Sequence, residues 1–269
     1  MRIGLTRAKI TWCPGCGNYG ILAALRRALE EVGAEPSRVV LVAGIGCHGR
    51  IADYLNVNSI HTIHGRVLPV AIGVKLANPA LTVICHSGDG DAYAIGLGHL
   101  PHAARYNVPI TLVVHNNMLY ALTAGQASPT SPRGLRTRST PHGQAEEPLN
   151  PILLALASGA TFVARGFSGD VGKLAEILVR AMRHRGFAFV DVLQPCITFY
   201  DTYDYIRERA YYLEEEQHDA RDLRRALSRA LERDRIPLGV FYESERPTML
   251  DRLPPPRCVE LSELAERFR

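Results

Sequence analysis

Short apolar runs alternate with segments of helical apolar spacing over the first two hundred residues of the chain. Such runs are typical of strands buried on both faces of a parallel sheet, and they occur at residues 39–43, 82–86, 110–115, 161–164 and 188–192. Helical spacing is found at residues 18–32, 69–77, 92–105, 151–158 and 171–183. Strands that alternate with helices predict an α/β fold with a doubly wound parallel sheet.

Two segments depart from this alternation. Residues 118–150 are rich in Gly, Pro, Ser and Thr, and they are long for a simple connection, so we expect them to cover a site. After residue 200 the chain becomes polar and Tyr-rich, with a charged helix predicted at 213–233 and a tail that contains three successive prolines, 254–256. We expect this C-terminal part to be a helical or extended appendage on the surface or on a partner.

Chemically active residues follow the predicted strands. Cys47, Asp89, Asn117 and Cys196 each lie just past the carboxyl end of one of them. Ligands of doubly wound sheets bind in the crevice at this edge. The sequence therefore predicts that these four residues belong to one site region.

Asp89 and Asn117 form the first candidate site. Gly88-Asp89-Gly90 ends one strand and an Asn-Asn pair ends the next, and the 25 residues between the motifs suffice for one helix and one strand. Carboxylate and amide oxygens suit Mg²⁺, which keeps positions for phosphate oxygens and water. The glycines allow close approach of a diphosphate, and the N-terminus of the next helix favours the same anion. A tight turn with a helix cap would explain the triplet alone, but not its pairing with the asparagines.

Four of the six cysteines form a second candidate site. Cys13 and Cys16 make a CxxC motif near the N-terminus, and Cys47 and Cys196 follow strands. Four thiolates can hold a [4Fe–4S] cluster or a structural Zn²⁺ ion, and the residue pattern alone does not decide between them. A thioredoxin-like redox pair is the third reading of the CxxC motif, but no strand precedes it.

Composition and charge narrow the class of protein. A net charge of +4 with scattered basic residues argues against a nucleic-acid partner. No apolar run reaches the roughly 18 residues of a membrane span, and the N-terminus lacks an apolar signal segment, so we expect a cytoplasmic protein. Cysteines there serve as thiols or metal ligands rather than disulfides. Cys85, within a strand, and Cys258, in the tail, are interpreted as ordinary thiols.

Several long motifs resemble those of the beta subunit of 2-oxoacid:ferredoxin oxidoreductases. They read WCPGCGNYGIL, GIGCHGR, HGRVLPVAIGVKLANP, SGDGDAYAIGLGHLPHAARYNVPI, NNMLYALTAGQASPT and QPCITF, and IPLGVFYES extends the match. The resemblance implies thiamine diphosphate, with Mg²⁺ held by Asp89, Asn117 and the backbone carbonyl of Leu119. It implies a [4Fe–4S] cluster held by Cys13, Cys16, Cys47 and Cys196. The implied cofactor-binding residues are Gly46, Cys47, His64, Gly88, Asp89, Gly90, Asp91, Asn117, Leu119, Leu122 and Thr123.

The resemblance also implies a reaction and a partner. The reaction is the oxidative decarboxylation of a 2-oxoacid, such as 2-oxoglutarate or pyruvate, by coenzyme A (CoA), which yields acyl-CoA and CO₂ and passes electrons through the cluster to ferredoxin. An alpha subunit would supply the pyrimidine-binding domain, so the chain alone would be inactive. We expect residues 1–200 to form the cofactor-binding domain and residues 201–269 an extension that packs on the partner subunit.

Two polar residues are candidates for contact with the reacting groups. His64 belongs to a His-Gly-Arg motif that lies near the cofactor in the family, which implies a catalytic role, although a lone histidine is more often structural. Arg50 could bind the distal carboxylate of 2-oxoglutarate, or it is a solvated loop charge. The chain also has Ala121 and Ala124 where family members usually have glycine, which could narrow the pocket.

Two other classes of protein remain open on these grounds. A zinc-stabilised thiamine-dependent decarboxylase subunit would share the Gly-Asp-Gly and Asn-Asn motifs but transfer no electrons. The other class is a non-catalytic interaction subunit that keeps the fold, but the presence of Asp89, Asn117 and all four motif cysteines argues against it.

Overall fold

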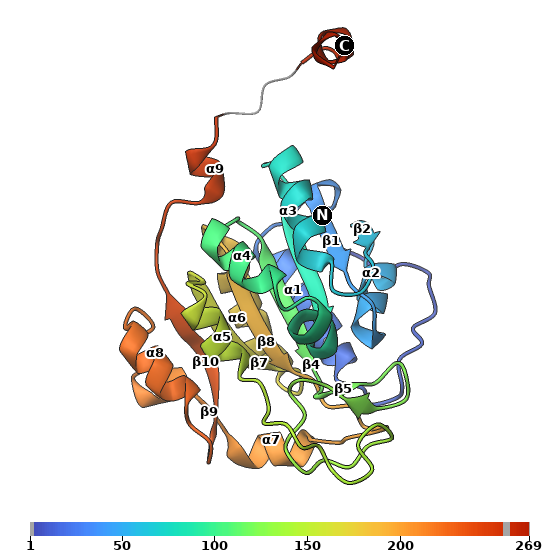
Figure 1. Ribbon diagram of the computed structural model, residues 1–269, viewed down its shortest axis with the longest axis vertical. Coiled ribbons are helices and arrows are strands. Elements are labelled where there is room, and N and C mark those ends of the chain that lie inside the picture. The colour runs from blue at the N-terminus through green and yellow to red at the C-terminus, as the bar shows by residue number, and fades with distance from the viewer. Residues whose placement is uncertain (1–2, 255–258, 269) are drawn as a thin grey trace.

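The computed structural model describes residues 3–254 and 259–268, organised around one eight-stranded sheet (Figure 1). The strand order is β2-β1-β3-β4-β8-β7-β10-β9. The first six strands in this order run parallel, which agrees with the predicted doubly wound sheet. These strands are β1 (Val39–Ala43), β2 (Asn58–His61), β3 (Thr82–Gly88), β4 (Thr111–Asn116), β7 (Phe162–Phe167) and β8 (Ala188–Leu193).

Helices cover both faces of the sheet, which is why its central strands are apolar along their whole length. α1 (Asn18–Glu31) and α6 (Val171–Arg183) form the layer on one face. On the other face lie α3 (Val67–Ala77), α4 (His99–Tyr106) and α5 (Pro151–Ala157). The remaining helices are α2 (Ile51–Tyr54), α7 (Tyr203–Arg209), α8 (Leu223–Ala230), α9 (Met249–Arg252) and α10 (Leu261–Arg267), with 3₁₀ helices at Pro36–Arg38, Cys47–Arg50 and Leu213–Glu216.

The C-terminal part of the chain adds two strands to the same sheet. β10 (Ile236–Glu243) pairs antiparallel with β7, and β9 (Ala210–Tyr212) pairs parallel with β10. No strand was predicted here, and Pro237, which cannot donate to a sheet ladder, would argue against one. The segment is nevertheless buried from Pro237 to Phe241, and its register with β7 shifts between Val240 and Tyr242.

The charged helix predicted at 213–233 is wrong in its extent. The chain ends its 3₁₀ helix with Gln217 in the left-handed region at φ 51°, and α8 starts afresh at Leu223. The side chain of Asp222 caps α8 by accepting hydrogen bonds from two backbone N–H groups. A left-handed residue and a new cap therefore divide one charged stretch into two elements.

The helix predicted at 92–105 is also interrupted. After Gly90 the chain makes a π-helical turn, Asp91–Ile95, and α4 begins only at His99. The backbone N–H of Gly96 donates to the carbonyl of Asp91 at 3.0 Å, and a Cβ at Gly96 would lie only 2.5 Å from that oxygen. The continuous α-helix predicted after the Gly-Asp-Gly motif is therefore replaced by a π turn. Such turns are frequent at functional sites.

The Gly- and Ser-rich segment begins with a small hairpin of β5 (Leu119–Tyr120) and β6 (Gln126–Ala127). Figure 1 places β5 and α7 at the end of the sheet where β4 finishes. Within the described ranges, no helix is long and apolar enough to cross a membrane. Pro255, Pro256 and Cys258, all in the predicted tail, lie outside these ranges.

Candidate active site

Two cavities adjoin at the carboxyl edge of the parallel strands. One has a volume of about 300 Å³ and is lined by the Gly-Asp-Gly motif, and the other has a volume of about 380 Å³ and is lined by cysteines. We call them the diphosphate cavity and the cysteine cavity. They share the lining residues Cys47, Asn117, Ala121, Leu122 and Gln194. The shared wall brings the two predicted sites within reach of each other.

The diphosphate cavity gathers every residue that the resemblance implied for the cofactor. These residues come from the loops after β1 and β2, from the ends of β3 and β4, from the start of the π turn and from the β5 hairpin. They are Gly46, Cys47, His64, Gly88, Asp89, Gly90, Asp91, Asn117, Leu119, Leu122 and Thr123. The same cavity is also lined by Ala121, which was expected to narrow the pocket, and by residues that were not predicted from the sequence, namely Ile45, His48, His115, Tyr120 and Gln194.

Asp89 is a buried carboxylate at the end of β3. Its side chain is 1% exposed, and Oδ2 accepts hydrogen bonds from the hydroxyls of Ser128 at 2.5 Å and Thr130 at 2.9 Å. Burial raises its pKa to about 6, against the opposing effect of these hydroxyls and of the Asn117 backbone. Ser128 and Thr130 belong to the covering segment 118–150, so the predicted loop does reach the site.

The two asparagines at the end of β4 have different surroundings. Asn116 points inward, where it donates to Oδ1 of Asp191 at 3.0 Å and accepts from Thr130 at 2.9 Å. Asn117 faces the cavities, donates to Gln194 at 3.2 Å, and accepts from the backbone of Leu119 at 3.0 Å. Asp89 and Asn117 are therefore neighbours, as the spacing of their motifs predicts.

Side chains packed around the motif account for its two glycines. A Cβ at Gly88 would lie 2.8 Å from Nδ1 of His48, and a Cβ at Gly90 would overlap the Tyr120 ring. A side chain at either position would force the His48 or Tyr120 ring to shift, so both positions favour glycine even before a ligand is considered. From the sequence, both glycines were explained only by the close approach of a ligand. The side chains that pack against them could not be inferred, because this packing depends on the tertiary structure.

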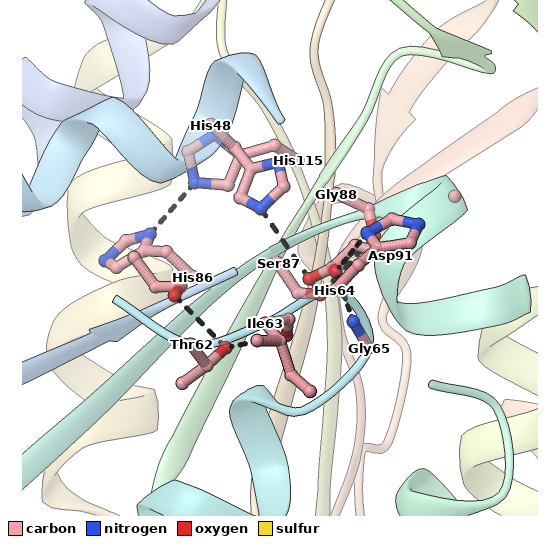
Figure 2. Close-up of polar contacts among 12 residues, drawn as sticks. His48, Thr62, Ile63, His64, Gly65, His86, Ser87, Gly88, Asp91 and His115 are labelled. Atoms are coloured by element: carbon pink, nitrogen blue, oxygen red, sulfur yellow. Dashed lines mark hydrogen bonds and ion pairs between the residues drawn. The ribbon is translucent and has the colours of Figure 1, made fainter. Parts of the chain in front are cut away.

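Asp91 organises the histidines of this cavity (Figure 2). One carboxylate oxygen lies 2.7 Å from Nδ1 of His64 and accepts from the Gly65 backbone at 2.7 Å. The other accepts from Ser87 at 2.5 Å and lies 3.7 Å from Nε2 of His48. Burial opposes the charge, but His48, Ser87 and Gly65 outweigh it and lower the pKa of Asp91. Asp91 thus carries the charge that lies beside His64, which is about one-third exposed and lines the cavity.

The four motif cysteines all line the cysteine cavity. Burial, with a contribution from the other three thiols, raises the pKa of Cys47 to about 11. Trp12 holds the Cys47 loop by donating from Nε1 to its backbone carbonyl at 2.7 Å, and Gln194 approaches Cys16 Sγ at 3.4 Å. In the described part of the chain, no three His, Cys, Asp or Glu side chains converge closely enough to hold a single metal ion.

Arg50 lies at the cysteine cavity rather than at the diphosphate cavity. Its side chain is 51% exposed and lies 3.5 Å from Asp53. A hydrogen bond to Tyr54 is the main cause that raises its pKa. The guanidinium is therefore charged and only loosely held by its neighbours.

We expect Ala124→Gly to raise the free energy of unfolding by about 0.5–1 kcal/mol. Ala124 has φ 82°, a left-handed conformation that costs a non-glycine residue roughly 1–3 kcal/mol. Glycine relieves this strain, but its greater freedom in the unfolded chain offsets about 0.4–1 kcal/mol of the gain. Ala121, in the same loop, has no positive φ, so Ala121→Gly should destabilise. Urea unfolding of both variants checks this, and equal effects would contradict it.

Two family models match consecutive parts of the chain. Residues 44–192 match the family model of the thiamine pyrophosphate enzyme, C-terminal TPP binding domain. Residues 196–257 match the model of the C terminal of the pyruvate ferredoxin oxidoreductase beta subunit. The first match spans both strand ends of the diphosphate cavity, and the second begins at Cys196.

Relatives and a solved structure agree with these matches. The 2-oxoacid:ferredoxin oxidoreductase subunit beta of Saccharolobus solfataricus is 48% identical over 87% of this chain and 82% of its own. The 2-oxoglutarate oxidoreductase subunit KorB of Mycobacterium tuberculosis is 45% identical over 74% of this chain and 54% of its own. The 2-oxoglutarate:ferredoxin oxidoreductase from Magnetococcus marinus, solved with 2-oxoglutarate, coenzyme A and succinyl-CoA bound, superimposes with a TM-score of 0.90 at 39% identity, over 98% of this chain and 89% of that one. The chain therefore belongs to the family of 2-oxoacid:ferredoxin oxidoreductase beta subunits.

Proposed function

We propose that this beta subunit holds thiamine diphosphate and Mg²⁺ in the diphosphate cavity and a [4Fe–4S] cluster in the cysteine cavity. When bound, thiamine diphosphate supplies the carbanion chemistry of 2-oxoacid decarboxylation, and the cluster supplies one-electron acceptance toward ferredoxin. The observation that carries the proposal is the wall that the two cavities share. The lining residues that the two cavities share would then lie between the two groups.

The donor set of the diphosphate cavity fits Mg²⁺ and an anion. Asp89 offers a carboxylate, Asn117 an amide oxygen and Leu119 a backbone carbonyl, all hard oxygen ligands. Burial makes an uncompensated charge on Asp89 costly, as its raised pKa shows, and a bound cation would compensate it. These three residues would hold the ion, and the loop after β1 would face the diphosphate.

The geometry of the cysteine cavity favours a cluster over a zinc ion. A single tetrahedral Zn²⁺ requires all four sulfurs about 2.3 Å from one point. The four thiols are among sixteen residues that line a cavity of about 380 Å³, which has room for a group larger than a single ion. A larger iron–sulfur group suits this cavity, with Cys13, Cys16, Cys47 and Cys196 as ligands. Reduced thiols of this kind also favour the cytoplasm as location.

His64 and Asp91 would act together beside the cofactor. Asp91 is buried and ionised, and its contact at 2.7 Å fixes which nitrogen of His64 faces the carboxylate. The other ring nitrogen is then left for the cavity, where it can hold or move a proton of the substrate. We assign His64 this catalytic role.

The proposal requires an alpha subunit that completes the cofactor site. We expect the purified chain to show no CoA-dependent 2-oxoacid oxidation, and the complex co-expressed with its alpha subunit to reduce ferredoxin. Metal analysis and the anaerobic absorption spectrum of the same complex test the cofactors. About four irons per chain with a broad band near 400 nm (a thiolate-to-iron transition) support the cluster, whereas zinc without colour would favour a decarboxylase subunit. Activity of the isolated chain would contradict the partner.

Arg50→Leu should raise KM for 2-oxoglutarate about tenfold or more and leave pyruvate turnover unchanged. The solved relative holds 2-oxoglutarate, and a guanidinium–carboxylate hydrogen bond contributes roughly 1.5–3 kcal/mol. Arg38→Leu, which removes an exposed arginine whose ion pair among the described residues is with Glu35, is the control. Unchanged 2-oxoglutarate kinetics in Arg50→Leu would show that Arg50 is a solvated loop charge.

A further inference from the structure

Asn18 is a buried polar residue that the proposed function leaves unexplained. It is the first residue of α1 and is 0% exposed. Its Oδ1 lies 2.7 Å from Nδ1 of His115. Its Nδ2 is buried and makes no hydrogen bond to the part of the protein that the structure describes. A buried donor without a partner is destabilising, so a missing partner is indicated.

A pair of buried histidines determines which way the amide points. Nδ1 of His86 lies 2.9 Å from Nε2 of His115, and both rings are buried. If His86 donates, His115 accepts at Nε2, donates from Nδ1 to Oδ1 of Asn18, and leaves the Asn18 NH₂ group free. In the reverse direction, Nε2 of His86 would be a buried N–H donor, and it has no partner in the described part of the chain. The amide of Asn18 would also be turned round, so that its oxygen would face the thiolates. The first direction avoids both costs.

The chain of donors requires that each ring is neutral. Both rings are buried, and burial disfavours a charged imidazole. A neutral imidazole has one donor and one acceptor, which is what each link of the chain requires.

The free N–H group of Asn18 faces the cysteines. Asn18 lines the cysteine cavity. Cys16 lies two residues before Asn18 in the chain and lines the same cavity. The N-terminus of the 14-residue helix α1 lies at the same place, and its partial positive charge favours an anionic group there.

We infer that the Asn18 amide donates a hydrogen bond to a sulfur of the cluster, and that His115, backed by His86, is a positioning residue that holds the amide in this orientation. The inference rests on the cluster proposed above. A donor to sulfur stabilises the reduced, more negative cluster more than the oxidised one. Asn18 therefore raises the reduction potential of the cluster and makes it a better acceptor for electrons from the thiamine site.

Redox titration of the co-expressed complex, followed by the electron paramagnetic resonance of the reduced cluster, tests this inference. We expect Asn18→Leu to shift the ratio of reduced to oxidised cluster about tenfold toward the oxidised form, which is about 59 mV for one electron. Tyr19→Phe, one residue further along α1, removes a hydroxyl that bonds the Trp12 carbonyl and should leave the potential unchanged.

A second variant covers the case in which Asn18→Leu fails to assemble. His115→Leu leaves Asn18 in place but frees its amide, and it should give a smaller shift in the same direction with iron retained. Equal potentials in wild type and both variants, each with about four irons, would overturn the inference while leaving the cluster proposal intact. Loss of iron from Asn18→Leu together with an unchanged potential in His115→Leu would also overturn it. A wild-type complex without iron would refute the cluster itself.

Discussion

Replacement of Asp89 by asparagine is expected to weaken Mg²⁺-dependent binding of thiamine diphosphate roughly 100-fold or more. The carboxylate is the only charged member of the proposed ligand set. Its hydrogen-bond partners Ser128 and Thr130 are uncharged, so they cannot supply the missing negative charge. Turnover of the assembled complex should fall with cofactor occupancy. Calorimetric titration of the complex with thiamine diphosphate, with and without Mg²⁺, measures the effect.

The same variant should be more stable than wild type when no metal is bound. The pKa of Asp89 is raised from 3.8 to about 6, so the folded state holds its proton more tightly than the unfolded state. This stabilisation is complete below pH 4 and is lost as the pH rises through about 6. At pH 7 the metal-free wild type carries a deficit of about 1–3 kcal/mol, which the neutral amide does not have. The advantage of the variant should disappear at pH 4.

Asp204→Asn is a matched control for both measurements. It makes the same change of charge on a side chain that is 90% exposed, so neither cofactor binding nor stability should change appreciably. Cofactor affinity retained in Asp89→Asn would refute the Mg²⁺ site. Stability that falls in parallel at pH 7 and pH 4 would instead show that Asp89 is a structural hydrogen-bond acceptor.

Cys196→Ser is expected to remove most of the iron and to reduce ferredoxin-linked turnover roughly 100-fold or more, because a cubane cluster requires four thiolate ligands. Cys196 is buried at 8% exposure, and the segment that follows it folds back through a bridge to Tyr200. A serine would fit there sterically, so the loss of iron reports ligation rather than misfolding. Iron analysis and the absorption near 400 nm measure it.

Cys85→Ala serves as the control for cluster loss. Cys85 is buried in β3 within the core beneath α3 and α4 and lines neither cavity. Its removal should lower stability by on the order of 1 kcal/mol but leave the iron content at the wild-type value. If Cys196→Ser kept all its iron, Cys196 would not be a ligand.

The sheet illustrates how much of the fold can be predicted from a sequence pattern. Each strand expected from a continuous apolar run is present. These strands are buried on both faces of the sheet, so almost every residue in them is apolar, and the pattern is visible in the sequence. β10 was missed because its evidence is tertiary: a strand that contains Pro237 becomes favourable only when β7 and β9 lie on either side of it. The helix after Gly90 was predicted too early, because a π turn depends on the contacts of Gly96.

The sequence by itself determined the family, the parallel sheet and the residues gathered at its carboxyl edge. Motifs at strand ends must meet in a parallel sheet, so spacing along the chain was sufficient to bring Asp89 near Asn117. Only the tertiary structure decided what surrounds them. Ser128 and Thr130 on Asp89, His48 over Gly88, and the His86–His115–Asn18 chain join residues from distant segments. Such contacts depend on how loops and helices pack across the edge of the sheet, and this packing cannot be inferred from the spacing of residues along the chain.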